Sequence, residues 1–203
     1  MAPHHAPRDA VAPIGEADTL APIALSTALG WGSRYVALLV ACIALGGSLF
    51  FSAVLGWLPC TLCWYQRILM YPLSVLIAVG ILRRDDGLPH YVLPFTLLGA
   101  GVSLYHYLLI KTDWFPPPPC QAGVPCTVDY IDLFGFINIP FLALTAFLLI
   151  TLMMAVAPLA PFVAPAEGAV GARPHALRAP AALLVYAIIG AVGAAFVIAS
   201  RLV

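Results

Sequence analysis

Residues 58–82 read LPCTLCWYQRILMYPLSVLIAVGIL, a stretch in which two thiols and one arginine precede a long apolar run. The run from residue 64 to residue 82 approaches the ~20 residues that an α-helix needs to cross the hydrocarbon core of a bilayer. Backbone groups in lipid must satisfy their own hydrogen bonds, so such a run is a helix rather than a strand. The stretch therefore predicts a membrane helix with reactive side chains at one edge.

The rest of the chain repeats this apolar pattern. Of its 203 residues, 63% are hydrophobic and only 9% are charged, whereas soluble domains carry roughly 25% charged residues. Runs of near-spanning length recur at 35–58, 91–111, 133–157 and 181–200. The formal net charge is zero, which gives no reason to expect a nucleic-acid partner. We predict an all-α polytopic membrane protein: a four-helix bundle with an additional C-terminal transmembrane helix.

Composition also divides the chain into segments. Residues 1–33 are rich in alanine and proline and have no compact basic start ahead of an apolar core. This composition argues against a cleaved signal peptide and predicts a flexible cytoplasmic tail. Residues 34–157 are expected to form the four-helix membrane unit. Residues 158–180 read as a cytoplasmic linker rich in proline and alanine, and residues 181–203 carry the extra helix.

Basic residues predict how the helices are oriented in the membrane. Arg34 precedes the first apolar run, and Arg83 and Arg84 fill the short link after the second. Arg173 and Arg178 follow the fourth run. By the positive-inside rule these segments, together with the N-terminus, are expected on the cytoplasmic side. The loops that carry paired cysteines then face outward, toward the compartment in which disulfides persist.

Four of the five cysteines form two close pairs on successive outer loops: Cys60 with Cys63, and Cys120 with Cys126. The fifth, Cys42, lies within an apolar run and is expected to be a small apolar filler. In the chain-entropy model, closing the 120–126 loop contributes only about 2.4 kcal/mol, and the shorter loop contributes less. Because a structural crosslink would favour a longer loop, both pairs are interpreted as exchangeable.

The first pair sits where a thiolate is stabilised. Pro59 suits the start of a helix, which places Cys60 and Cys63 near the first turn and on one face. Unpaired N–H groups and the helix dipole favour an anion there. Arg67, one turn after Cys63, adds a full positive charge, and an arginine inside a membrane helix requires a partner. The expected partners are the Cys63 thiolate and the carbonyl oxygen of a lipid-borne acceptor.

The second loop and the third run add further candidates. Prolines 116–119 predict a stiff polyproline II segment that holds Cys120 within reach of a soluble partner. His106, near the outer end of the third run, fits either an interfacial hydrogen-bonding role or a proton relay to a reduced acceptor. The aromatic residues of the loop are interpreted as interfacial anchors; they are Trp114, Phe115, Tyr130 and Phe134.

A metal site is the main alternative from a different functional class. A C-x-x-C pair is half of a common zinc site, and four cysteines are enough for a tetrahedral one. Sites of this kind usually occur in soluble, reducing compartments, whereas these cysteines are predicted to border the outer leaflet. We therefore expect no metal, and metal analysis with thiol counting separates the two hypotheses.

Four segments, LPCTLCWYQRILMYPL, SLYHYLLI, GVPC and YIDLFGFINIPFLALTAFLLI, together resemble the bacterial disulfide-bond formation protein B (DsbB) family. The resemblance is closer to its BdbC-like branch, in which the second cysteine pair is tightly spaced, and it covers roughly residues 35–157. It implies a multi-pass protein of the bacterial plasma membrane that makes disulfides de novo. The partner implied is an extracytoplasmic thioredoxin-fold disulfide oxidase, and the electron acceptor implied is a membrane quinone, either ubiquinone or menaquinone.

The resemblance also implies roles for individual residues. By position, Cys60 and Cys63 correspond to the quinone-facing pair, with Cys63 as the thiolate beside the quinone. Arg67 corresponds to the quinone-contacting arginine, and His106 matches a histidine near the quinone site. Gln66 stands where some members have an acidic residue, and no role is expected of it.

Cys120 and Cys126 resemble the pair that exchanges disulfides with the soluble partner. A vitamin-K-epoxide-reductase-like protein also has two pairs, but there the loop pair comes first, and here that order is reversed. A thiol-reducing conduit would use the same residues with electrons flowing the other way, and the sequence does not set that direction. The tail at 1–33 and the run at 181–200 depart from the family pattern, and the small residues of that run suit close helix packing.

Overall fold

The computed structural model describes residues 16–116, 124–156 and 179–202, and these residues form five α-helices. Each helix contains a segment that is long and apolar enough to cross a membrane. Within the described ranges there is no strand, only an isolated bridge between Leu133 and Ile137. The predicted all-α membrane architecture is confirmed. The helices are α1 (Glu16–Ala53), α2 (Thr61–Arg83), α3 (Leu88–Lys111), α4 (Ile139–Val156) and α5 (Ala179–Leu202).

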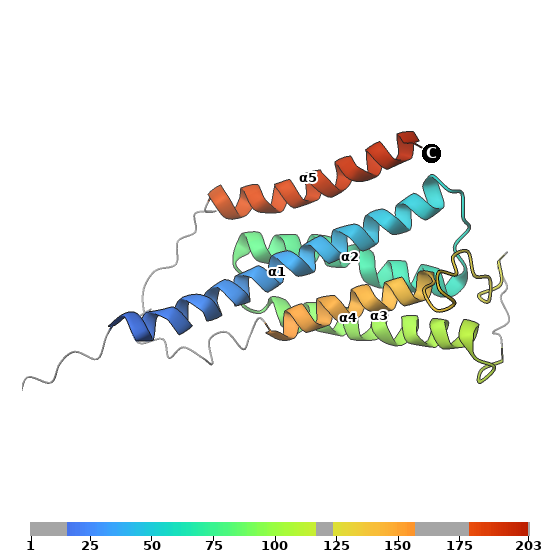
Figure 1. Cartoon of the computed structure of the whole chain (residues 1–203), viewed down its shortest axis with the longest axis horizontal. Helices are drawn as coiled ribbons and strands as arrows, with labels where there is room; N and C mark the ends of the chain where they lie inside the picture. The colour runs from blue at the N-terminus through green and yellow to red at the C-terminus, as the bar shows by residue number, and fades with distance from the viewer. Residues whose placement is uncertain (1–15, 117–123, 157–178, 203) are drawn as a thin grey trace, which may run out of the picture.

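Helices α1 to α4 form the bundle, and α5 lies alongside α1 at its edge (Figure 1). Around the bundle, α1 packs against α2 and α4, while α3 completes the ring by packing against the same two helices. The fifth helix packs mainly on α1 and to a lesser extent on α2. The bundle is therefore a four-helix unit to which α5 is added, as predicted.

The centre of the bundle is filled by apolar side chains from all four helices. Leu38, Leu73, Val92 and Phe147 are fully buried and belong to one continuous core. Many other large apolar side chains, such as Leu98, are exposed on the outer surface. An outward-facing apolar surface is expected where lipid, and not water, surrounds the helices.

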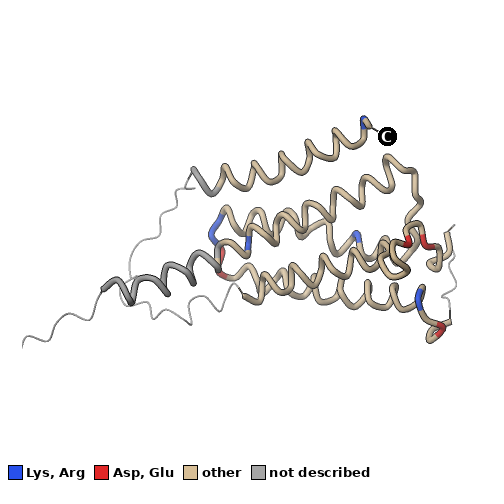
Figure 2. The backbone as a smooth tube through the Cα atoms, in the orientation of Figure 1, with Lys and Arg blue, Asp and Glu red and all other residues tan. Residues whose placement is uncertain are grey.

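Most charged residues lie toward the two ends of the bundle (Figure 2). At one end, Arg34 of α1 forms an ion pair of 3.5 Å with Asp86, in the link that follows Arg83. At the other end, Lys111 forms ion pairs of 3.2 Å with Asp129 and with Asp132. The ion pair of Arg34 therefore joins α1 to the α2–α3 link, and the ion pairs of Lys111 join α3 to the loop before α4.

The first helix differs from its predicted extent. It begins at Glu16 and ends at Ala53, so residues 16–33 are helical where a flexible tail was predicted. This segment is rich in alanine and leucine, which are strong helix formers, and it continues directly into the membrane segment Gly32–Ala53. Residues 1–15 of the predicted tail, and the predicted linker up to residue 178, lie outside the described residues.

The fourth helix begins later than the sequence indicated. Residues 133–137 form a tight turn closed by two backbone hydrogen bonds of 2.9 Å. Phe134 and Gly135 have positive φ angles of 58° and 77°, which a helix does not allow. Asn138 then caps α4, because its side-chain oxygen accepts a hydrogen bond of 3.0 Å from the N–H of Phe141. The turn and the cap together set the start of α4.

Gly99 of α3 gives a direct test of the packing between α3 and α4. It lies against the Phe147 ring, and a Cβ at this position would overlap that fully buried ring. We expect Gly99→Ala to destabilise the bundle by about 1–3 kcal/mol, because a close-packed core has little room to adjust. The measurement is a lowered thermal unfolding temperature in detergent.

Gly101 provides the matched control on the same helix, since a Cβ there meets no atom within 4 Å. Gly101→Ala should leave the unfolding temperature unchanged or raise it slightly, because alanine is the better helix former. Equal unfolding temperatures for the two variants would contradict the packing described for α3 and α4.

Candidate functional site

The first cysteine pair lies at the start of α2. Cys60 is the N-cap residue, with extended backbone angles, and its sulfur accepts a hydrogen bond of 3.4 Å from the N–H of Cys63. A serine, threonine, asparagine or aspartate oxygen usually fills this role. The Cys60 thiol in turn donates to the Cys63 sulfur at 3.3 Å. The C-x-x-C spacing therefore brings both sulfurs to one end of the helix, as predicted.

The two thiols of this pair hold their protons unequally. The hydrogen bond to Cys63 and burial raise the pKa of Cys60 to about 11. Cys60 therefore stays protonated at neutral pH and directs its S–H at the Cys63 sulfur. When the reduced pair gives up one proton, the charge is expected on Cys63, where the N-terminus of α2 favours an anion.

His106 of α3 connects the first pair to the second cysteine loop. Its side chain is only 2% exposed, and its Nε2 lies 3.0 Å from the backbone oxygen of Cys126 and 3.8 Å from the Cys60 sulfur. Its Nδ1 lies 3.4 Å from the side-chain nitrogen of Gln66. A carbonyl oxygen can only accept, so we place the ring proton on Nε2, and Nδ1 accepts from the Gln66 amide.

The described part of the second loop is fastened to the bundle beside these groups. Cys126 is 2% exposed and shares a small buried cluster with Cys60 and Leu109. Further along the loop, the Tyr130 hydroxyl donates to the Leu58 carbonyl at 3.1 Å, just before the first pair. The structure therefore brings Cys126 next to the first pair. Cys120, the other predicted shuttle cysteine, and most of the polyproline segment lie outside the described residues.

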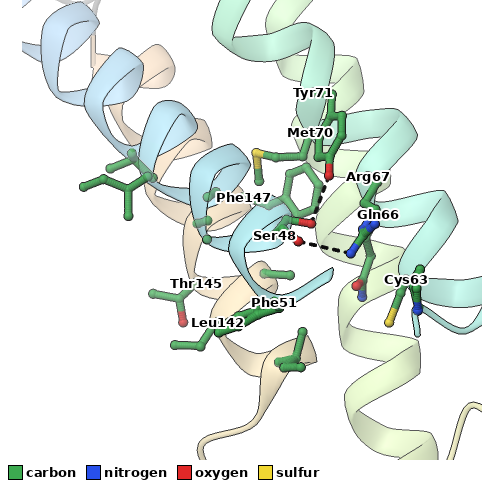
Figure 3. A pocket seen from close by; sticks show the side chains of 18 of the residues that line it. Ser48, Phe51, Cys63, Gln66, Arg67, Met70, Tyr71, Leu142, Thr145 and Phe147 are labelled. Atoms are coloured by element: carbon green, nitrogen blue, oxygen red, sulfur yellow. Dashed lines mark hydrogen bonds between the residues drawn. The ribbon is translucent and has the colours of Figure 1, made fainter. Parts of the chain in front are cut away.

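A cavity of about 490 Å³ opens beside Cys63 (Figure 3). Helices α1, α2 and α4 form most of its walls, and the 57–59 link, Tyr130 and Phe196 of α5 complete them. The lining is largely apolar, with polar side chains at Ser48, Cys63, Gln66, Arg67, Tyr71 and Thr145. Small-molecule sites usually combine such an apolar lining with a few convergent polar groups. The volume also falls within the range of about 300–1,000 Å³ that is typical of ligand sites.

Arg67 reaches the cavity with a different protein partner from the one predicted. Its guanidinium donates to the Ser48 carbonyl of α1 at 3.1 Å (Figure 3). It also lies over the Trp64 ring, 5.4 Å from the ring centroid. The Ser48 hydroxyl is 3.2 Å from the Tyr71 hydroxyl. A backbone carbonyl and an aromatic face therefore stabilise a cation that lies nearly two turns inside α2. This bond uses one of five guanidinium N–H donors.

The positions of the His106 and Gln66 side chains differ most from what the sequence suggested. His106 lies at the thiol pair and does not line the cavity. Gln66, of which no role was expected, is 5% exposed, lines the cavity and donates to His106. A buried amide in a membrane helix needs a hydrogen-bond partner, and its i+3 spacing from Cys63 places it on the cavity side. These two signals would have identified Gln66 from the sequence.

An aromatic stack borders the cavity near the same end. Trp57 is stacked on Tyr130, with ring centroids 5.3 Å apart, and also on Phe51 at 5.3 Å. All three residues line the cavity. Tyr130 was interpreted as an interfacial anchor, and in the structure it also closes one wall of the cavity.

Comparison of the chain with known proteins identifies its family. Residues 33–157 match the family model of the disulfide bond formation protein DsbB. The chain belongs to the DsbB family. It is therefore a multi-pass membrane thiol–disulfide oxidoreductase, and the resemblance seen in the sequence is confirmed.

Similar proteins of the DsbB family carry the name disulfide formation protein C. The disulfide bond formation protein C of Bacillus subtilis (strain 168) is 50% identical over 121 residues, which is 59% of this chain and 88% of that protein. The probable disulfide formation protein C of Halalkalibacterium halodurans is 50% identical over 113 residues, which is 55% of this chain and 82% of that protein. No solved structure matches the chain. Helix α5 lies outside the region that matches the DsbB model.

The raised pKa of Cys60 predicts how the pair reacts with alkylating reagents. Below a pH of about 11 the Cys60 thiol keeps its proton, so its alkylation should be slow near neutral pH and should accelerate as the pH rises toward that value. Cys63→Ala removes the largest cause of the shift, so Cys60 should then titrate closer to an ordinary thiol and react faster. The measurement is the alkylation rate of each cysteine-containing peptide against pH, by mass spectrometry.

Cys42→Ala is the control, because Cys42 belongs to the main core and not to the cluster around Cys60. This variant should leave the Cys60 profile unchanged. Fast alkylation of Cys60 near neutral pH in the reduced wild-type protein would contradict the assigned hydrogen bond.

Proposed function

We propose that this DsbB-family protein reoxidises an extracytoplasmic thioredoxin-fold disulfide oxidase and passes the electrons to a membrane quinone. The observation that carries the proposal is that Cys63, one of two thiols 3.3 Å apart, faces an apolar cavity that also receives a guanidinium. An apolar cavity within the membrane helices suits a lipid-soluble acceptor, and Gln66 and Arg67, within about one turn of Cys63 on α2, present polar groups to it.

The cysteines carry the thiol–disulfide steps. A thiolate of the reduced partner attacks the Cys120–Cys126 disulfide, and the partner then becomes oxidised as both loop thiols are released. A loop thiolate next attacks the Cys60–Cys63 disulfide at Cys60, which frees the Cys63 thiolate at the cavity. The burial of Cys126 in one cluster with Cys60 supports this exchange. Each cycle oxidises two partner thiols and releases two electrons and two protons.

The residues around the cavity fit a quinone. Arg67 presents a permanent cation and Tyr71 a hydroxyl, groups that bind carbonyl oxygens, while the remaining walls accept an apolar ring and chain. A bound quinone supplies a two-electron, two-proton acceptor. Cys63 would be the donor beside it, and Arg67 would stabilise negative charge on the acceptor oxygen, in the manner of an oxyanion hole.

His106 acts on the thiols in this proposal and not on the acceptor. Its Nε2–H is shared between the Cys126 carbonyl and the Cys60 sulfur, so it holds the two exchanging segments together. Gln66 fixes the ring orientation through Nδ1. The family resemblance implies that His106 lies near the quinone site, and we propose that its role there is to position Cys60 against Cys126.

The orientation in the membrane follows from the charges at the two ends. Cys60, Cys63 and Cys126 lie at the end opposite Arg34, Arg83 and Arg84. Because basic residues favour the cytoplasmic side, we propose that the cysteine end is extracytoplasmic. Labelling of Cys63 by a membrane-impermeant thiol reagent in intact cells would support this orientation, and labelling only in inverted vesicles would refute it.

Metal binding is a second candidate function, because three potential metal ligands lie close together. One ligand atom each from Cys60, Cys63 and His106 lies within 4.8 Å of the others. Two thiolates and an imidazole are a set that zinc accepts. Against this reading, the Nε2 of His106 is engaged with the Cys126 carbonyl at 3.0 Å. Stoichiometric zinc with protected thiols in the purified reduced protein would establish the metal site, and reactive thiols without metal would favour the relay.

The role of Arg67 gives the sharpest test of the quinone step. We expect Arg67→Ala to slow quinone reduction on the order of a hundredfold, as removal of one oxyanion donor does in other enzymes. Thiol exchange between the partner and the loop pair should change little, because that step involves neither Cys63 nor the cavity. The two half-reactions are measured separately, by quinone absorbance and by trapping the partner's thiols.

Arg83→Ala is the matched control, since Arg83 is exposed at the opposite end of the same helix. It should leave both half-reactions intact. Equal losses in both half-reactions of Arg67→Ala would contradict the role assigned to Arg67.

A further inference from the structure

Helix α5 contributes to the cavity although it lies outside the region that matches the DsbB family. Its inner face packs on the bundle through Val185, which is fully buried, and through Ile188 and Val192 one and two turns later. The next residue on this face, Phe196, lines the same cavity as Cys63 and Arg67. The extra helix is therefore part of the wall around the proposed quinone site.

A second cavity, of about 380 Å³, lies between α1 and α5. Its lining is almost entirely apolar, with Ser200 as its one hydroxyl residue among the lining positions, and Phe196 belongs to this lining as well. Phe196 is thus shared by both cavities. Its ring also lies 6.2 Å from the Phe50 ring of α1, which lines the second cavity.

Two consecutive glycines of α1 adjoin this shared residue. Gly47 lines the first cavity, and Gly46 lines the second. The Phe196 ring rests directly on Gly46, where a Cβ would overlap it. Because neither glycine has a side chain, the Phe196 ring can lie directly against the α1 backbone beside both cavities.

We propose that the isoprenoid tail of the quinone passes Phe196 and lies in the cavity between α1 and α5. This inference rests on the proposed function and names the part of the ligand that α5 binds. The thiol of Cys63, the amide of Gln66 and the guanidinium of Arg67 all face the first cavity, so the quinone ring belongs there. A long apolar tail then gains by burial in an adjoining apolar cavity. Helix α5 thereby favours quinones with long tails over tail-less ones.

Gly193→Leu tests the tail path without disturbing the ring site. Gly193 lines the second cavity, and a Cβ there meets no atom within 4 Å, so the added side chain fills the cavity without a clash. The dissociation constant of a long-tailed isoprenoid quinone should rise about tenfold, the equivalent of about two methylene groups left unburied. That of a tail-less quinone should not change. Both are measured on the purified full chain by quenching of tryptophan fluorescence, since Trp57 lines the first cavity.

Gly190→Leu is the matched control on the same helix. Gly190 is exposed, lines neither cavity, and also leaves a Cβ in open space. It should leave both dissociation constants at the wild-type values. An unchanged affinity of Gly193→Leu for the tailed quinone would overturn the inference and would assign the cavity to lipid acyl chains. Equal weakening for both quinones would also overturn it, whereas failure of the wild-type protein to bind either quinone would overturn the proposed function itself.

Discussion

The hydrogen bond from the Cys60 thiol to the Cys63 sulfur is the interaction on which the site depends. It exists because Cys60 caps α2, which holds the two sulfurs 3.3 Å apart at a helix N-terminus. The same bond keeps the proton on Cys60 and leaves Cys63 as the sulfur that faces the cavity. In the proposed relay, Cys60 is the sulfur that the loop attacks in the oxidised pair, and Cys63 is the electron donor.

The membrane environment sets the second constraint. A cation nearly two turns inside a membrane helix is costly unless protein groups surround it. The Ser48 carbonyl and the Trp64 ring stabilise Arg67 and hold its guanidinium at the cavity. The neighbouring buried polar groups, Gln66 and His106, also satisfy each other. The polar groups of the site therefore form two connected sets, one around the arginine and one around the thiols.

Much of the fold follows from the sequence, because span length and hydropathy determine membrane helices almost alone. The C-x-x-C spacing and Pro59 were likewise enough to place the first pair at the start of α2. Other features depend on contacts between distant segments. No local pattern shows that the Arg67 guanidinium meets a carbonyl of α1, or that His106 faces Cys60 instead of the cavity. The later start of α4 also arises from a turn whose positive φ angles interrupt an apolar run.

We propose that electrons leave the protein from the Cys63 sulfur to a lipid-soluble quinone. The most direct measurement is a stopped-flow experiment in which reduced thioredoxin-fold partner is mixed with the purified protein and a quinone, and quinone absorbance is followed. The wild-type protein should reduce one quinone for each partner disulfide formed. Cys63→Ser should reduce none, although the partner should still form mixed disulfides with the loop. Continued quinone reduction by Cys63→Ser at the wild-type rate would show that Cys63 is not the electron donor.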